Sequence, residues 1–212
     1  MTGYPITLVG LDTARVVVVG GGSVAARKVE ALREAGARPI VVSPILCDEL
    51  KELASQGEIV VIPRTYRAGD LRSARLVVAA TDDEATNEAV WREAQRTGCL
   101  VNVVDDPARC NFYVPATVRR GALTLSVSTD GHSPLLSRRI RQQLESSFDA
   151  AYEPYIALLG ELRPFVQARV PDPARRRELW QALLDSDVLD LFRAGEPTAA
   201  RKQANAVVGR YL

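Results

Sequence analysis

The first half of the chain alternates apolar segments with amphipathic ones. Residues 15–19 contain four consecutive valines, and a run without a polar side is typical of a strand buried on both faces. Four more apolar segments are predicted as strands, at residues 39–43, 58–62, 76–80 and 100–104. Helical patterns at residues 26–35, 46–54 and 84–95 separate them. This alternation predicts an α/β domain with a parallel sheet, over residues 1–113.

The pattern changes in the second half. Residues 112–118 and 122–128 are apolar segments on either side of Arg119-Arg120-Gly121, which predicts a β-hairpin. From Leu135 onward apolar residues recur at helical spacing, and two proline-containing breaks predict three or four short helices. So small a unit is expected to pack on the first domain or on a second subunit.

Composition narrows the classes of partner. The net charge is +1, which argues against nucleic acid or an acidic membrane as a partner. The chain has 24 Arg and only 3 Lys, which fits either codon usage or a ligand rich in carboxylates. The three cysteines form no zinc or disulfide pattern, so no metal site is predicted. With no signal-peptide layout and no long apolar run, the expected location is the cytoplasm, with no membrane contact.

A glycine-rich loop follows the first strand. Gly20-x-Gly22-x-x-Ala25 matches the pattern of a dinucleotide-binding turn that leads from a strand into a helix. The first glycine makes the turn, the second lets a pyrophosphate approach the backbone, and the helix N-terminus offers free N–H groups. The expected cofactor contacts in this loop are Gly20, Gly22, Ser23 and Val24.

The second strand lacks the acidic residue that usually binds the adenosine ribose of NAD. Its end reads Ser43-Pro44-Ile45, and no adjacent arginine is placed for a 2′-phosphate. The hydroxyl of Ser43 could bind a ribose hydroxyl, so NAD is favoured over NADP. Ser43, Pro44 and Ile45 are therefore expected at the cofactor.

Polar clusters follow the fourth and fifth strands, where ligands of such sheets bind. Thr81-Asp82-Asp83 is interpreted either as a helix N-cap or as a cofactor contact. Asp105 is either a turn residue or a carboxylate at the mouth of the cofactor cleft. The expected cofactor contacts here are Thr81, Asp82, Asn102 and Val104.

Five stretches in this order resemble the precorrin-2 dehydrogenase/sirohydrochlorin ferrochelatase family, which includes the N-terminal module of bacterial sirohaem synthase. They are Pro5-Ile6, residues 19–28, residues 79–83, residues 102–107 with Cys110-Asn111-Phe112 and Pro115-Ala116, and Ser128-Thr129-Asp130-Gly131-His132-Ser133-Pro134. The resemblance is specific over residues 5 to about 150, and general over the helical tail.

The resemblance implies a homodimer with a Rossmann domain at residues 1–113, a dimerisation region at 114–148 and a helical C-terminal module at 149–212. The implied reaction is the NAD-dependent oxidation of precorrin-2 to sirohydrochlorin. Many members of the family then insert ferrous iron to give sirohaem, and a dehydrogenase without chelatase activity stays an alternative. A nucleotide-sensing module is a further alternative, but the chain shows no DNA-recognition helix and such a module would not explain the motif at residues 128–134.

The resemblance also implies roles for particular residues. Asp105 matches the aspartate invoked as the catalytic base. The implied substrate contacts are Asn111, Ser128, Thr129, His132 and Ser133. Nearby arginines are interpreted either as solvated surface residues or as partners of substrate carboxylates; they are Arg119, Arg120, Arg138, Arg139 and Arg141. Asp130 departs from the family motif, which usually has small residues before the glycine.

Overall fold

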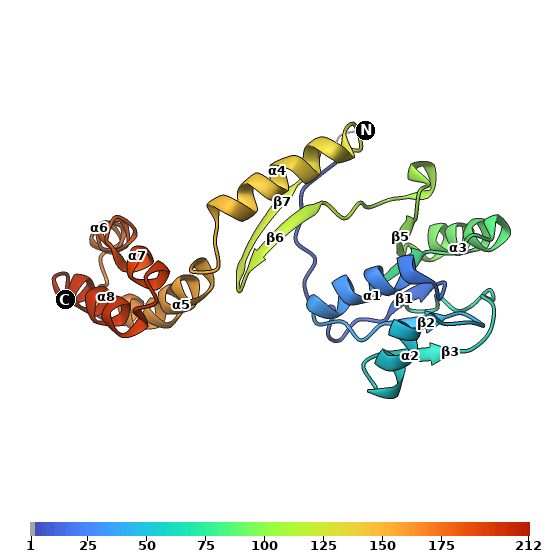
Figure 1. Cartoon of the computed structure of the whole chain (residues 1–212), viewed down its shortest axis with the longest axis horizontal. Helices are drawn as coiled ribbons and strands as arrows, with labels where there is room; N and C mark the ends of the chain where they lie inside the picture. The colour runs from blue at the N-terminus through green and yellow to red at the C-terminus, as the bar shows by residue number, and fades with distance from the viewer. Residues whose placement is uncertain (1–2) are drawn as a thin grey trace. The chain divides into compact units, whose positions relative to one another are not determined.

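The structure is a computed structural model that describes residues 3–212 (Figure 1). The chain divides into two compact units, one of residues 4–114 and one of residue 3 with residues 115–212. The three-part division expected from the sequence stays a prediction. No helix in the described part of the chain is long and apolar enough to cross a membrane.

The first unit is a five-stranded parallel sheet in the order β3-β2-β1-β4-β5. This order confirms the predicted Rossmann-type fold. Its elements are β1 (Val16–Val19), α1 (Ser23–Glu34), β2 (Ile40–Val42), α2 (Asp48–Ser55), β3 (Val60–Ile62), β4 (Leu76–Ala79), α3 (Glu84–Thr97), β5 (Leu100–Val103) and the 3₁₀ turn η1 (Pro107–Arg109).

The valines of β1 explain why this strand is central. All four are buried. Val16 and Val18 pack into one apolar cluster with residues of α1 and α2, and Val17 and Val19 pack into a second cluster with residues of α3. Helices therefore cover both faces of the sheet, as the unbroken apolar run predicts.

The carboxyl end of β1 is the point where the chain order reverses, because β2 lies on one side and β4 on the other. Backbone bonds continue the sheet just beyond the strands. Gly20 N donates to Val42 O over 3.0 Å, and Ala80 N donates to Val19 O over 2.7 Å. The segments that leave β1, β2 and β4 therefore start side by side, at the edge where such sheets bind ligands.

The second unit contains the predicted hairpin and five helices. These are β6 (Ala116–Arg120), β7 (Leu123–Val127), α4 (Pro134–Ser147), α5 (Tyr152–Arg169), α6 (Pro173–Leu184), α7 (Val188–Arg193) and α8 (Pro197–Gly209). The strands are antiparallel, with Val118 opposite Leu125. The expectation of three or four short helices was wrong, because this unit has five helices in the described chain. One of them, α5, spans 18 residues, and α7 is a separate helix of six residues.

Two predicted boundaries also differ. Helix α1 begins at Ser23 and not at residue 26, because Gly22 already has the extended backbone of an N-cap. Strand β6 begins at Ala116 and not at residue 112. The reason is that Phe112 is held by the first unit, where its carbonyl accepts a hydrogen bond from Asn102 Nδ2 over 3.1 Å.

Candidate cofactor and active site

The glycine-rich loop has three glycines with three different surroundings. Gly20 has φ +123°, and a Cβ there would lie 2.1 Å from Ala80 O. A Cβ on Gly21 would lie 1.9 Å from Ile45 O, whereas a Cβ on Gly22 would meet nothing within 4 Å. Gly20 and Gly21 are therefore glycines because the loop packs against the segments after β4 and β2, and Gly22 borders open space.

Gly21 was not singled out by the sequence reasoning, since the dinucleotide pattern leaves that position variable. The structure shows that its backbone matters too, because Gly21 O accepts a hydrogen bond from Cys47 N over 2.7 Å. The bond ties the glycine loop to the start of α2. The run of three successive glycines, Gly20-Gly21-Gly22, was the signal in the sequence that could have identified Gly21.

Helix α1 begins at this open space without a side-chain cap and without an acidic residue in its first turn. Its first N–H groups, including those of Ser23 and Val24, have no partner within the helix, and the helix dipole adds a partial positive charge. Ser23 is exposed and Val24 is half-buried. Room beside Gly22 and free donors at a positive helix end fit the pyrophosphate of a dinucleotide.

The loop after β2 is shaped by Ser43. Its hydroxyl donates to Ile45 O over 2.7 Å, and the residue is 7% exposed. This hydroxyl is therefore engaged within its own loop, so a bond to a ribose would add to that contact. Pro44 and Ile45 are exposed, with Ile45 78% exposed.

The polar cluster in the turn after β4 was interpreted either as a helix N-cap or as a cofactor contact, and the structure shows the N-cap at Asp83. Asp83 is the N-cap of α3, where it accepts bonds from Ala85 N (3.2 Å) and Thr86 Oγ1 (2.5 Å). The bond from Thr86 lowers the pKa of Asp83. Thr81 is half-buried and Asp82 is exposed, so both stay candidates for cofactor contact.

Asp105 and Asp106 differ sharply, although they are neighbours after β5. Asp105 has φ +61°, is exposed, and makes no hydrogen bond or ion pair within residues 3–212. Asp106 caps η1 by accepting from Ala108 N over 3.1 Å, and it pairs with Arg109 over 2.8 Å. Positive φ is uncommon for residues other than glycine, although aspartate tolerates it better than most, and such conformations are enriched at functional sites. Asp105 is therefore the carboxylate that is free for chemistry.

The side chains of Asn102 and Asn111 form hydrogen bonds that tie the edge strand β5 to the segment after it. Asn111 Oδ1 accepts from Val101 N over 2.7 Å, and its Nδ2 donates to Cys99 O over 3.2 Å. Both ends of this amide are thus engaged, so a substrate contact would have to compete with them. Asn102 is half-buried, and its Nδ2 donates to Phe112 O and, over 3.4 Å, to Cys110 Sγ. Val104 packs against the apolar cluster of α1 and α2.

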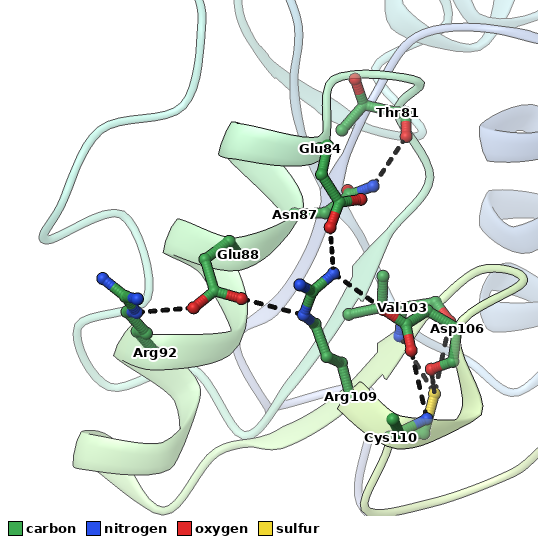
Figure 2. Close-up of polar contacts among 10 residues, drawn as sticks. Thr81, Glu84, Asn87, Glu88, Arg92, Val103, Asp106, Arg109 and Cys110 are labelled. Atoms are coloured by element: carbon green, nitrogen blue, oxygen red, sulfur yellow. Dashed lines mark hydrogen bonds and ion pairs between the residues drawn. The ribbon is translucent and has the colours of Figure 1, made fainter.

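Arg109 joins the segment after β5 to helix α3, and the sequence reasoning did not identify it. Figure 2 shows its guanidinium between three carboxylates: Nη1 lies 2.5 Å from Glu84 Oε1 and 2.8 Å from Asp106 Oδ2, and Nε lies 2.9 Å from Glu88 Oε2. Glu88 also pairs with Arg92 over 2.6 Å. The neighbouring carboxylates, Glu84 first, raise the pKa of Arg109. Sequence could not reveal the contacts with Glu84 and Glu88, because each of these residues lies more than 20 positions from Arg109.

The remaining predicted substrate contacts lie in the second unit, in the turn between β7 and α4. Thr129 Oγ1 accepts from Ser133 N (3.1 Å) and lies 3.0 Å from Ser137 Oγ. Ser133 is the N-cap of α4 and accepts from Leu136 N over 3.3 Å. Thr129 and Ser133 therefore organise the turn, and the exposed residues Ser128 and His132 present their side chains to solvent.

Asp130 lies at the tip of this turn. It has φ +49° and the following Gly131 has φ +81°. The backbone N–H of Asp130 donates to Ser128 Oγ over 3.1 Å. Asp130 can adopt this left-handed conformation because a short polar side chain tolerates it better than most residues. The departure from the family motif is thus compatible with the turn.

The arginines proposed for substrate carboxylates fall into two groups. Arg120 donates to the carbonyls of Glu145 and Phe148, and Arg141 pairs with the Glu145 carboxylate over 2.6 Å. Arg138 and Arg139 are exposed on α4 and make no hydrogen bond or ion pair within the described chain. Among the five arginines predicted at the substrate, these two therefore present guanidinium groups that are available to a carboxylate ligand. Arg119 is exposed on β6.

In the part of the chain that the structure describes, no three His, Cys, Asp or Glu side chains are grouped to hold a metal ion. Cys47, Cys99 and Cys110 are free thiols. Burial raises the pKa of Cys99 to about 11 and also raises the pKa of Cys110. Both shifts favour the neutral thiol over the thiolate.

Three protein families match successive parts of the chain. Residues 8–116, more than half of its length, match the family described as "Putative NAD(P)-binding". Residues 120–147 match the sirohaem biosynthesis protein central family, and residues 151–207 match the sirohaem synthase dimerisation region.

Whole-chain relatives agree with these matches. The chain is 43% identical over 199 residues to a siroheme synthase of Thioalkalivibrio sulfidiphilus, covering 94% of this chain and 40% of the relative. It is 38% identical over 193 residues to a siroheme synthase of Pseudoalteromonas translucida, covering 91% and 41%. The chain thus spans about two fifths of these relatives. Among solved structures it resembles SirC, a precorrin-2 dehydrogenase, with TM-score 0.78 and 31% identity over 97% of this chain and 98% of that one.

Proposed function

The chain belongs to the family of precorrin-2 dehydrogenases and of the corresponding part of sirohaem synthases, and on that premise we propose that it oxidises precorrin-2 to sirohydrochlorin with NAD. The observation that carries the proposal is the free carboxylate of Asp105. It leaves β5 in a left-handed turn, at the same edge of the sheet as the glycine loop.

The glycine loop and the first turn of α1 would hold the pyrophosphate of NAD. Gly22 leaves room for it and the free N–H groups of Ser23 and Val24 would donate to it. The nicotinamide half of a dinucleotide extends over the second half of such a sheet, beyond β4 and β5. Thr81, Asp82, Asn102 and Val104 are the proposed contacts there. Bound NAD supplies the hydride acceptor for the oxidation.

The oxidation removes one hydride and one proton from the macrocycle, so a base is needed beside the site of hydride loss. Asp105 is the proposed base, since its carboxylate makes no hydrogen bond or ion pair within residues 3–212, whereas Asp106 is tied to Arg109. The proton passes to an Asp105 oxygen and then to solvent, which the exposure of the residue permits. This side chain needs no metal ion for that step.

Binding of the substrate would depend on its carboxylates. Arg138 and Arg139 are exposed and unpaired within residues 3–212, and a guanidinium binds a carboxylate in two-pronged geometry. Ser128, Thr129, His132 and Ser133 would contribute hydrogen bonds from the turn before α4, with Asn111 as a further contact. We place the enzyme in the cytoplasm, where its free thiols would stay reduced.

Iron insertion is a second activity that this family context favours, because the relatives are siroheme synthases. Ferrous iron would be a substrate here and not a resident metal. The observation that favours this activity is the unpaired carboxylate of Asp105, which could also accept pyrrole protons during insertion. A dehydrogenase without chelatase activity is the alternative.

An anaerobic assay tests the proposed reaction directly. Purified protein should convert precorrin-2 to sirohydrochlorin only when NAD is added, with one NADH formed per macrocycle, as followed by the chromophore spectrum and NADH absorbance. Ferrous ion is then added to separate the two alternatives: a sirohaem spectrum formed faster than without protein supports chelatase activity. Absence of NAD-dependent oxidation would overturn the proposed function.

We further propose a homodimer, because residues 151–207 match a dimerisation region. This match lies in the segment expected from the sequence as the helical C-terminal module, and residues 114–148, expected there as the dimerisation region, overlap the match to the central family at 120–147. A groove of about 670 Å³ lies between α5 and α6 in that region. Ile156, Leu159 and Trp180 line it with apolar surface, and Arg163 and Arg177 add charge. Light scattering should give a mass near twice 23.1 kDa. A monomer at micromolar concentration would contradict this proposal.

A further inference from the structure

We propose that Arg109 is a positioning residue for the reaction: by clamping the segment after β5 to helix α3, it holds Asp105 in the conformation that accepts the proton. This inference rests on the proposed role of Asp105 as base. Arg109 lies outside the motifs that identify the family, and it acts through its neighbour without touching the substrate.

The clamp joins two separate elements through one side chain. From α3, Glu84 and Glu88 approach the guanidinium at 2.5 and 2.9 Å, and from the turn Asp106 approaches it at 2.8 Å (Figure 2). The side chain of Arg109 is 24% exposed, so it is shielded more than a free surface arginine. Three contacts in fixed directions require the planar fork of arginine, and one lysine ammonium could not reproduce them.

Asp106 transmits the clamp to Asp105, because the two are joined by one peptide bond. Five hydrogen bonds from neighbouring residues hold Asp106 in place. Its N–H donates to Val103 O over 3.2 Å, its carboxylate accepts from Ala108 N and Arg109, and its carbonyl accepts from Arg109 N and Cys110 Sγ. Asp105 itself has no side-chain bond in the described chain, so these contacts to the next residue are what hold its left-handed backbone.

The backbone conformation of Asp105 explains why a clamp matters. Aspartate tolerates φ +61° better than most residues, but negative φ remains the more populated region, so a loosened turn would let Asp105 leave this conformation. Relaxation would swing the carboxylate away from the sheet edge. A misplacement of about 1 Å at a catalytic group costs on the order of 10²-fold in rate. Loss of the clamp should therefore lower turnover and leave the cofactor loop, which Arg109 does not contact, unchanged.

The test is a double-mutant cycle on the dehydrogenase reaction. Arg109→Met should lower kcat for precorrin-2 oxidation by about 10–100-fold, with the Kd for NAD, measured by calorimetry, within about twofold of the wild type. In an Asp105→Asn background the same substitution should cost less than about twofold, because Arg109 acts only through the carboxylate that is already gone. An equal loss in both backgrounds, or no loss in the wild-type background, would overturn the proposal.

Arg92→Met is the matched control. Arg92 also pairs with Glu88, over 2.6 Å, but it does not contact the segment after β5. Its replacement should leave kcat within about twofold of the wild type. Should Arg109→Met fail to fold, Arg109→Lys keeps the charge without the fork and should still lower kcat; wild-type kcat for this variant would overturn the clamp. If Asp105→Asn alone retains full activity, the proposed base is wrong, and that outcome is distinct from failure of the clamp.

Discussion

Asp105→Asn is expected to slow precorrin-2 oxidation by about 10²–10⁴-fold while the affinity for NAD stays nearly unchanged. Asparagine keeps the size of the side chain and tolerates the left-handed backbone at φ +61°, so the turn should survive. Only the basic carboxylate is lost. Single-turnover rates from the chromophore spectrum, with calorimetry for NAD, separate the chemical step from cofactor binding.

Asp106→Asn is the matched control for this variant. The amide oxygen can still accept from Ala108 N, so the cap of η1 should persist, while the NH2 group takes the place of the oxygen that accepts from Arg109. The variant loses the ion pair with Arg109, so its effect on oxidation should not exceed the about 10–100-fold loss expected for Arg109→Met and should stay below that of Asp105→Asn. Chelation is assayed separately, starting from sirohydrochlorin. Wild-type turnover by the Asp105 variant would show that catalysis depends on substrate positioning, with proton loss to solvent.

Gly22→Asp is expected to weaken NAD binding by at least about tenfold, on the order of 1.4 kcal/mol, while the fold survives. A Cβ at Gly22 meets no atom within 4 Å, and the residue is the uncapped N-cap of α1. Aspartate is a preferred N-cap, so thermal stability should stay equal or rise. The same carboxylate would occupy the space for the pyrophosphate and repel it. Calorimetry and a thermal melt measure the two effects.

Gly22→Ala separates charge from volume at the same position. It adds only the Cβ, which the structure accommodates, so its loss of NAD affinity should be smaller than that of the aspartate variant. Unchanged NAD affinity in Gly22→Asp would remove the glycine loop from the cofactor site. A lower melting temperature would instead show that the loop does not tolerate the new side chain.

Local patterns in the sequence were enough for the sheet and for the cofactor loop. The valine run of β1 reports burial on both faces directly, since no polar side chain could be hidden there without a partner. The glycine pattern likewise indicates a backbone conformation set within the loop itself, because Gly20 adopts φ +123°, which residues with a Cβ rarely adopt. The resemblance of short motifs then supplied the expected reaction and the expected base.

Tertiary contacts decided what local patterns could not. Whether Asp105 or Asp106 is free depends on Arg109, and whether Gly21 tolerates a side chain depends on Ile45. Asn111 was predicted at the substrate, yet its amide completes the edge of β5. In each case the deciding partner comes from another segment of the chain.

The sequence by itself therefore determined the parallel sheet with helices between its strands and the glycine-rich turn after the first strand, because each depends on residues within one turn or strand; the role of Asp105 as base stays a prediction from the resemblance. Only the tertiary structure decided which side chains are already engaged. A hydrogen bond or ion pair is satisfied by a partner's position in space, and Glu84 and Arg109, 25 residues apart, become partners only when β5 aligns beside β4 and α3 packs over the sheet. The number of residues between Glu84 and Arg109 in the sequence does not indicate how close their side chains lie in the fold.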